Sequence, residues 1–422
     1  MSISVLVAVR GPREATVAAA VGAAPDLRVA RRCADLGEAL AAAHAGLGVA
    51  VVVSEQPQLH RGVVAEFIAA GVAVIGSPGT YAATDHLRSI GIEEIVPPDA
   101  SAEDIAAAIA RAVRQAPEVE HAAEGATGEH VAPNAPQRGS IVAVWGPTGA
   151  PGRTTVAVSL AYDFAQAGGA LLVDADTYGG AVAQALGMLD EAPGIAALAR
   201  ASLHGTLGDE TVRRHALEAA PGLRVLSGIT RAERWPELSA AALEPVWDLL
   251  RLHSSITVVD CGFSLEQDEE LQYDTRAPQR NGATLSALAA ADVVVAVGSA
   301  EPLGVQRLVH ALSELDAVAP ADVTARVVAV NRVRASVAGD QPRRAIADAL
   351  KRFAGVDTVW TIGWDPRGCD AATLSGQALG ERAPRSAARK AIQAIGREVL
   401  RVCASGARVD APAAPAQATL GA

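Results

Sequence analysis

The stretch VAVWGPTGAPGRTTVAVSLA, residues 142–161, constrains the fold of this 422-residue chain more than any other. It begins with an apolar β-like run, continues through a turn rich in glycine and proline, and ends in an alanine-rich helical segment. Such a strand, turn and helix predict a parallel sheet covered by helices. The free N–H groups of the helix would face the turn, an arrangement that binds phosphate. The turn contains no lysine, although phosphate-binding loops normally have one.

Residues 1–115 predict a separate α/β domain. Short β-like runs such as SVLVAV and VAVVVS alternate with helical runs such as REATVAAAVGAA and SAEDIAAAIARAVRQ. Five strands and five helices in strict alternation indicate a doubly wound, flavodoxin-like sheet. In topology and length, this domain resembles the receiver domains of two-component signalling.

The strand ends of this domain lack the chemistry of a working receiver, which needs an acidic pair, a phosphorylatable aspartate and a lysine after its first, third and fifth strands. These positions hold Val9, Arg10 and Gly11, then Ser54 and Glu55, then Pro97, Pro98 and Asp99. We therefore expect a pseudo-receiver used for contacts or dimerisation. Glu55 is either a built-in phosphate mimic or a simple solvent-exposed side chain.

The rest of the chain predicts a linker, a larger domain and a tail. Residues 116–139 are polar and rich in Pro, Gly, Ala and Glu, which is typical of a flexible linker. A second α/β alternation over residues 140–404 predicts a doubly wound, mostly parallel P-loop NTPase domain. Residues 405–422 offer little to bury and are expected to be disordered.

Composition limits the classes of function. The net charge of −11 argues against broad, non-specific nucleic-acid binding by the whole surface, and specific nucleic-acid binding is not expected either, although a local basic patch stays open. Four widely spaced cysteines suit a reducing cytoplasm, and no zinc spacing is present. No secretory signal and no apolar run of about 18 residues is found, so we expect a cytoplasmic protein. Only two of the 36 basic residues are lysine. This coding bias is a simple explanation for an arginine at a position where lysine is usual.

Three residues of the GRTT segment match roles in a P-loop. Gly152 permits close approach of a phosphate, Arg153 takes the lysine position, and Thr154 is the Mg²⁺ ligand. The residue at the first expected glycine is Pro147.

Polar strand ends follow in the order that a P-loop ATPase requires. LLVDADTYGG contains Asp174 and Asp176, ITVVDCGFS contains Asp260, and ARVVAVNRV contains Asn331. Carboxylates at these ends can hold the water shell of Mg²⁺ or orient an attacking water, and the amide can contact a purine edge. A single aspartate after an apolar strand is commonly just a solvated turn, so the specificity lies in the ordered set.

This set resembles the deviant Walker A ATPases of the MinD/ParA superfamily, a SIMIBI class of P-loop proteins. The segments ADVVVAVGSAEPLGVQ and TIGWDPRGCDAATLSGQ fit the same superfamily. The chain is most similar to the CpaE/TadZ group of pilus-assembly proteins and to actinobacterial septum-site-determining-like proteins, over about residues 140–404. That group often has a pseudo-receiver ahead of the ATPase, which extends the resemblance to nearly the whole chain.

The resemblance implies an ATP or ADP site with Mg²⁺ and a face-to-face homodimer around two nucleotides. It implies catalytic roles for Asp176, which would position water, and for Asp260, which would bind Mg²⁺ with Thr154, partly through water. Asn331 would contact adenine. The other implied nucleotide contacts are Thr148, Gly149, Ala150, Gly152, Arg153, Thr154, Thr155 and Asp174.

The loop departs from the superfamily at its cations. The signature lysine, which reaches the partner's phosphates across the dimer, falls at Thr148, and the ordinary P-loop lysine falls at Arg153. A planar guanidinium is not equivalent to an ammonium, and Pro151 lacks an N–H donor. Loss of a cation that stabilises the transition state costs on the order of 10³-fold in rate, while binding survives on backbone donors. We therefore expect nucleotide binding with slow or absent hydrolysis.

The predicted function is a nucleotide-dependent positioning or assembly factor with protein partners in a pilus or secretion apparatus. A septum-site or chromosome-partitioning regulator, a nucleotide-independent scaffold and a metabolic phosphoryl-transfer enzyme or ligase are the alternatives. The last helical segment has a basic face and an apolar stripe that includes Ile392, Ile395 and Val399. It predicts either a helix that faces the core or peripheral contact with DNA or with the inner face of the membrane, such as at a cell pole.

Overall fold

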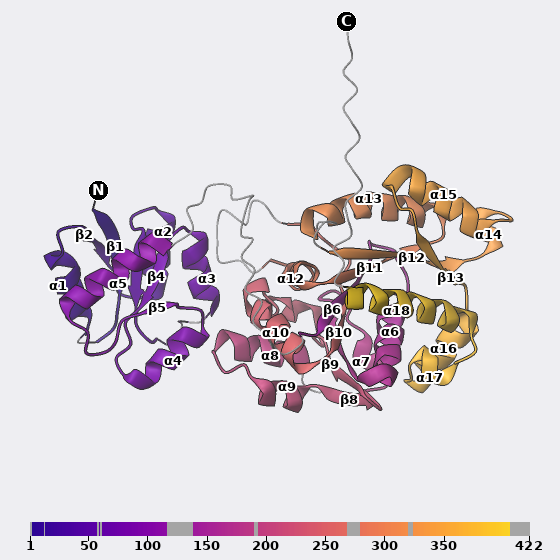
Figure 1. The fold of residues 1–422 in the computed structure, drawn as a ribbon, viewed down its shortest axis with the longest axis horizontal. Coiled ribbons are helices and arrows are strands. Elements are labelled where there is room, and N and C mark those ends of the chain that lie inside the picture. Colours follow the sequence, from indigo (N-terminus) through magenta and orange to yellow (C-terminus); the bar gives the residue numbers. More distant parts are fainter. Residues whose placement is uncertain are drawn as a thin grey trace, which may run out of the picture. The chain divides into compact units, whose positions relative to one another are not determined.

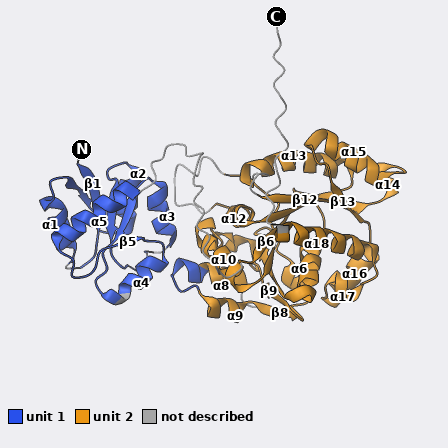
Figure 2. Ribbon diagram, viewed as in Figure 1, with its two compact units in different colours: residues 1–135, 200–207 blue, residues 136–199, 208–422 orange. Residues whose placement is uncertain are grey.

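The computed structural model describes residues 2–11, 13–56, 59, 61–115, 138–189, 193–267, 279–319 and 324–405. Residues 116–137 of the expected linker and residues 406–422 of the expected tail lie outside this part of the chain. The chain divides into unit 1, with residues 1–135 and 200–207, and unit 2, with residues 136–199 and 208–422 (Figure 2). Each unit is built on a sheet of its own.

The sheet of unit 1 has the order β2-β1-β3-β4-β5, and its described strands are all parallel. This confirms the flavodoxin-like topology. Every residue of β3 and β4 is buried, because α1 and α5 cover one face and α2, α3 and α4 cover the other (Figure 1). The elements are β1 (Ile3–Ala8), α1 (Arg13–Ala23), β2 (Leu27–Arg32), α2 (Leu36–His44), β3 (Ala50–Val53), α3 (Arg61–Ala69), β4 (Ala73–Gly76), α4 (Tyr81–Ser89), β5 (Glu94–Ile95) and α5 (Ala102–Gln115).

The sheet of unit 2 has the order β13-β12-β11-β6-β10-β7-β9-β8 in the described residues. Only the edge pair of β8 and β9 is antiparallel among these strands, so the predicted doubly wound, mostly parallel sheet is confirmed. The elements from residue 140 onward are β6 (Ser140–Trp145), α6 (Arg153–Gly168), β7 (Ala170–Ala175), α7 (Val182–Ala185), α8 (Gly194–Leu203), α9 (Asp209–His215), β8 (Leu217–Ala220), β9 (Leu223–Leu226), η1 (Ala232–Glu237), α10 (Ala240–His253), β10 (Ile256–Cys261), α12 (Gly282–Ala290), β11 (Val293–Ser299), α13 (Pro302–Val318), β12 (Ala325–Val333), α14 (Ala335–Ala338), α15 (Pro342–Ala354), β13 (Val359–Gly363), α16 (Pro366–Ser375), α17 (Leu379–Arg382) and α18 (Ala387–Ser405).

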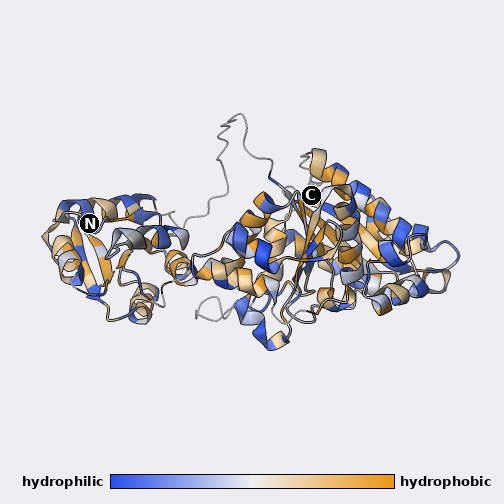
Figure 3. Cartoon of the chain, turned by 90° about the horizontal axis from the view of Figure 1, so that it is seen from below, coloured by the Kyte–Doolittle hydropathy of each residue, from blue (hydrophilic) through white to orange (hydrophobic). Residues whose placement is uncertain are grey.

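Helices cover both faces of the central strands of unit 2. Helices α6 and α18 pack on one face, while α10, α12 and α13 pack on the other (Figure 1). The central strands are therefore continuous apolar runs such as the fully buried VVVAVGS of β11. Hydrophobic and hydrophilic residues alternate around the surface helices, as expected for helices with one buried face (Figure 3). This packing fixes the carboxyl ends of β6, β7, β10 and β12 along one edge of the sheet.

The C-terminal helix α18 faces the core. Its stripe of Ile392, Ile395 and Val399 is buried in the same cluster as Phe164 of α6. The apolar stripe that could have entered a membrane is thus used in packing, which agrees with the core-facing alternative. None of the described helices is long and apolar enough to span a bilayer.

Candidate nucleotide site

The loop between β6 and α6 has the backbone geometry of an anion-binding turn. Gly149 and Gly152 have φ angles of 72° and 89°, in the left-handed region that glycine tolerates best. A Cβ on Gly146 would overlap the carbonyl of Val297, so that position also requires glycine. Helix α6 starts at Arg153, and no side chain caps its N-terminus. Its first N–H groups are therefore free to bind an anion.

Thr154 and Asp260 meet directly beneath this loop. Asp260 lies near the end of β10, which pairs with both β6 and β7. The Thr154 hydroxyl donates to Oδ2 of Asp260 at 2.6 Å. The other carboxylate oxygen, Oδ1, is buried and has no hydrogen-bond partner. An orphaned carboxylate oxygen beside a threonine hydroxyl is a donor set that suits Mg²⁺, directly or through water.

The described residues contain no cluster of three His, Cys, Asp or Glu side chains that could hold a metal ion on their own. A Mg²⁺ ion in such a site typically takes one or two protein ligands and completes its shell with phosphate oxygens and water. Thr154 and Asp260 therefore fit a nucleotide-bound Mg²⁺ rather than an independent metal site.

Burial makes the two strand-end carboxylates poor anions when no cation is bound. Asp174 and Asp260 are register partners on β7 and β10. Burial, together with charge repulsion from the nearby Asp174, raises the pKa of Asp260 to about 8, although the hydrogen bond from the Thr154 hydroxyl opposes the rise. Burial raises the pKa of Asp174 to about 7, although the backbone N–H groups of Val182 and Asp176 oppose the rise. A divalent cation would lower both pKa values by stabilising the ionised forms.

Asp174 and Asp176 have different surroundings. Asp174 is 2% exposed and accepts from the backbone N–H groups of Asp176 at 3.2 Å and Val182 at 3.1 Å. Asp176 accepts from the N–H of Tyr178 at 2.9 Å and lies 3.7 Å from Nη2 of Arg153. Asp174 is thus enclosed by its own turn, whereas Asp176 faces the cation of the loop.

Arg153 makes long contacts only. Its Nη1 donates to the carbonyls of Gly146 at 3.3 Å and Pro147 at 3.4 Å, and its ion pair with Asp176 is 3.7 Å long. Nε is buried without a partner. Stronger charge-assisted bonds are nearer 2.8 Å, so a phosphate could replace these contacts at little cost.

Asn331 joins the loop to a neighbouring cavity. Strand β12 continues past Asn331 to Val333, and the Asn331 amide Nδ2 donates to the carbonyl of Pro151 at 2.9 Å. The same side chain lines a cavity of about 170 Å³ that also includes Gly152 and Thr155. The structure thus brings the predicted purine contact to the edge of the predicted phosphate loop.

A scan against protein-family models found no match, and no curated protein matched the chain. Among solved structures, the chain is similar to a ParA family ATPase from Chlorobium tepidum, with 17% identity, a TM-score of 0.51, and coverage of 62% of this chain and 99% of that chain. The septum site-determining protein MinD of Pyrococcus horikoshii, solved as a complex with Mg-ADP, is also similar, with 18% identity, a TM-score of 0.50, and coverage of 64% and 99%.

Unit 2 has the fold of the MinD and ParA ATPases. The fold expected from the sequence resemblance is therefore confirmed. At these identities the likeness concerns the fold alone. The finer similarity to CpaE/TadZ proteins and the roles of the individual site residues stay predictions.

The walls of the small cavity were not singled out from the sequence. Within the MinD/ParA fold they come from the ends of β12 and β13, where Arg332, Trp364 and Asp365 line it with Asn331. Arg332 has a φ of 59°, the one positive value outside glycine in the described residues, and its guanidinium lies 4.8 Å from the Trp364 ring. The sequence could have indicated these walls, because the WDP segment follows an apolar strand and its Asp365 caps the next helix.

The segment before α12 contains an arginine that is held by its own chain. Arg280 donates to the carbonyls of Thr177 at 3.3 Å and Ala232 at 3.2 Å. Its guanidinium also stacks 4.4 Å from the ring of Tyr178. These contacts hold the Arg280 side chain within unit 2.

The equivalent edge of unit 1 is closed by its own side chains. Arg13 donates to the Ser77 hydroxyl and to the Pro97 carbonyl, both at 3.2 Å. Glu55 is exposed, and both of its carboxylate oxygens lie 3.0 Å from the N–H of Gly79, from which they accept. An arginine thus occupies the edge at which a receiver would hold Mg²⁺.

Proposed function

We propose that this protein is a MinD/ParA-type switch that binds ATP with Mg²⁺ and acts as a positioning or assembly factor. The observation that supports this most is the 2.6 Å bond from Thr154 to Asp260 beneath an uncapped helix N-terminus. Neither a simple turn nor a packed core requires a buried carboxylate with an orphaned oxygen at that place.

The roles follow from the contacts. Backbone N–H groups from Thr148 to Thr155, including those of Gly149, Ala150 and Gly152, would surround the phosphates, with Arg153 as their cation. Thr154 and Asp260 would hold Mg²⁺, which would neutralise charge on the phosphates when bound. Asp176 would orient water, and Asp174 would hold the turn in which Asp176 lies. Asn331 would contact the base in the small cavity, for which adenine is the choice that the sequence resemblance implies.

Hydrolysis is proposed to be slow or absent. Thr148 is exposed and uncharged, so the loop lacks the cation expected there. Arg153 lies 3.7 Å from Asp176, so the carboxylate that would orient water faces the cation of the loop in this structure. Binding and hydrolysis are thereby separated in one site, which suits a switch that stays assembled for long periods.

For the biological role, we propose a nucleotide-dependent homodimer that presents a surface to the proteins of a pilus or secretion apparatus, with unit 1 as a contact module. The MinD fold neighbour is named for septum-site determination, which keeps a cell-division or partitioning role as the alternative. Any contact with the inner face of the membrane would be peripheral, since α18 uses its apolar stripe in the core.

A nucleotide-independent scaffold is the second candidate. The contacts of Arg153 with the Gly146 and Pro147 carbonyls and with Asp176 favour it, because they satisfy the cation without a ligand. Their length is the argument against it.

Binding of Mg-ATP and Mg-ADP to the purified full chain, measured by calorimetry together with turnover, separates these candidates. We expect saturable micromolar binding and little turnover. Asp176→Ala should keep binding and remove residual turnover, and Arg153→Ala should weaken binding. The absence of saturable binding below millimolar nucleotide would leave the scaffold as the better account, and fast turnover that survives Asp176→Ala would refute the assigned roles.

A further inference from the structure

The loop lacks a cation at Thr148, but a side chain from another element lies beside it. A Cβ on Gly149, the residue after Thr148, would overlap Nη1 of Arg307 on α13. The guanidinium therefore lies against the backbone of the loop. Sequence motifs did not indicate this residue, because it lies inside a helix and far along the chain from the loop.

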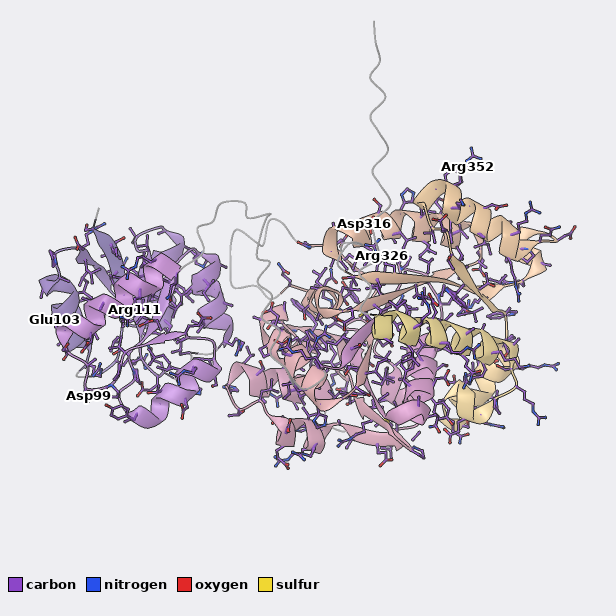
Figure 4. The ribbon with its side chains drawn as sticks, viewed as in Figure 1. Asp99, Glu103, Arg111, Asp316, Arg326 and Arg352 are labelled. Atoms are coloured by element: carbon purple, nitrogen blue, oxygen red, sulfur yellow. The ribbon has the colours of Figure 1, made fainter. Side chains whose placement is uncertain are left out.

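Helix α13, which carries Arg307, is anchored to two strands of the sheet. The next residue, Leu308, is fully buried and packs so closely on Gly298 of β11 that a Cβ there would come 2.5 Å from Leu308 Cδ2. Near the other end of the helix, Asp316 forms an ion pair of 2.5 Å with Arg326 of β12 (Figure 4). The guanidinium is thus presented by a helix that is anchored to two strands.

Arg307 has no compensating anion. It forms no ion pair or hydrogen bond with any residue of the described part of the chain, whereas Arg334 of the same unit pairs with Glu301 at 3.0 Å. A guanidinium stays charged at all physiological pH values. Arg307 is exposed, and an unpaired cation beside a loop with an anion-binding backbone is the arrangement expected when an anionic ligand supplies the partner.

A second donor without a partner lines the same groove. Trp145, at the end of β6, is 1% exposed, and its Nε1 is buried with no hydrogen-bond partner. With Thr148, Arg307 and His310 it lines a groove of about 700 Å³ between the loop and α13. Glu266 and Glu314 also line the groove, so the anion is expected at the loop side, where Arg307 lies.

We propose that Arg307 is the phosphate-binding cation that replaces the missing lysine at Thr148, and that it contacts the terminal phosphate of ATP at this loop. The inference rests on the proposed nucleotide binding. A planar guanidinium can give two parallel hydrogen bonds to phosphate oxygens. Because ADP lacks the terminal phosphate, this contact would favour ATP over ADP. Lysine at 307 would keep the charge but lose this geometry.

The test compares the full-length parent protein with Arg307→Ala, Arg307→Lys and the double variant Arg307→Ala/Thr148→Lys. Arg344→Ala, which removes an exposed arginine from α15, is the matched control. Calorimetry with Mg-ATP and Mg-ADP is followed by sedimentation with each nucleotide. We expect Arg307→Ala to weaken ATP binding about tenfold with ADP binding within about twofold, Arg307→Lys to be intermediate, and the double variant to recover part of the loss.

The outcomes distinguish the two proposals. If the parent binds ATP and Arg307→Ala changes neither ATP affinity nor ATP-promoted self-association, the role of Arg307 is overturned while the proposed function stands. If the parent binds no nucleotide, both fail. A loss of ATP affinity in the monomer supports contact with the chain's own nucleotide, and a loss of self-association alone supports contact with the nucleotide of a second copy.

Discussion

The carboxyl edges of the two sheets differ in what satisfies their polar atoms. In unit 1, Arg13 bonds to Ser77 and to the Pro97 carbonyl, and Glu55 accepts from Gly79. In the described residues just after β3, the one buried atom without a partner is a neutral amide oxygen, Oε1 of Gln56. In unit 2, the corresponding edge contains a buried Asp260 oxygen and a Trp145 N–H that have no partner. Both sheets are doubly wound and parallel in their central strands, so the difference lies in the side chains and not in the topology.

This comparison shows how a ligand site can be told from a closed strand edge on one scaffold. Open α/β sheets place loops at the carboxyl ends of their strands whether or not a ligand binds there. Protein groups that pair with each other remove the cost of burying them, while unpaired buried groups keep that cost until a ligand arrives. Unit 1 is therefore expected to be indifferent to nucleotide and unit 2 to be stabilised by it.

The largest expected effect comes from Asp260→Asn, which keeps the size of the side chain but removes its charge. Loss of a Mg²⁺ ligand should reduce the gain in ATP affinity caused by Mg²⁺ by about 10–100-fold. Calorimetry with and without Mg²⁺ measures this gain. Glu55→Gln in unit 1 is the control and should leave it unchanged. If Mg²⁺ raised the ATP affinity equally in the parent and in Asp260→Asn, Asp260 would not be a Mg²⁺ ligand. The two sheet edges would then not differ in metal binding.

A smaller effect is expected in the pH dependence of stability without Mg²⁺. The pKa of Asp260 is about 8 in the folded chain, against about 3.9 for an exposed aspartate. Because the folded form binds the proton more tightly, its stabilising contribution is complete below about pH 4 and is lost as pH rises towards 8. Since Asp174 shifts in the same direction, we expect unit 2 to lose stability throughout the range from pH 5 to pH 8.

Urea unfolding of the full chain at several pH values measures this loss. Asp260→Asn should flatten the curve, since an amide does not titrate in this range. A curve of unchanged slope in Asp260→Asn would mean that the buried carboxylate is not the cause.

The smallest effect is expected at the closed edge. Arg13→Ala removes two hydrogen bonds of 3.2 Å from a partly exposed side chain and should destabilise unit 1 by about 1 kcal/mol. Hydrogen exchange of the β4 and β5 amides in the full chain reports this loss. Nucleotide affinity should stay the same, and a change in it would mean that the edge of unit 1 contributes to the site.

The sequence predicted the parts of this molecule that depend on local patterns. Apolar runs and alanine-rich helices were sufficient for the doubly wound, mostly parallel character of both sheets, since parallel strands and their crossover helices have few alternative arrangements. No apolar run or helical pattern in the sequence predicted the antiparallel edge pair of β8 and β9 or the short helices near it. Their existence depends on packing against the rest of unit 2.

The candidate site was predictable where it lies on strand ends and the loop. Asp174, Asp260 and Asn331 lie along one edge because parallel strands present their carboxyl ends there. Arg307 could not be found in this way, since it reaches its place through tertiary packing. Trp364 stands in a segment that fits the superfamily, but the segment did not indicate its place in the cavity wall. At the edge of unit 1, the sequence indicated only that the acidic residues of a receiver are missing. The hydrogen bonds of Arg13 at that edge are visible only in the structure.

The hydrogen bond from Asn331 to the Pro151 carbonyl has a consequence for how such a protein could change its ligand. The amide that lines the small cavity, where we propose that the base binds, also contacts the backbone on which the phosphates would lie. A substitution of Asn331 that changed the preference for one purine over another would therefore also change the affinity for every nucleotide. Base preference and overall affinity therefore cannot change independently at this residue. Asn331 thus limits the substitutions by which this chain could come to bind a different nucleotide.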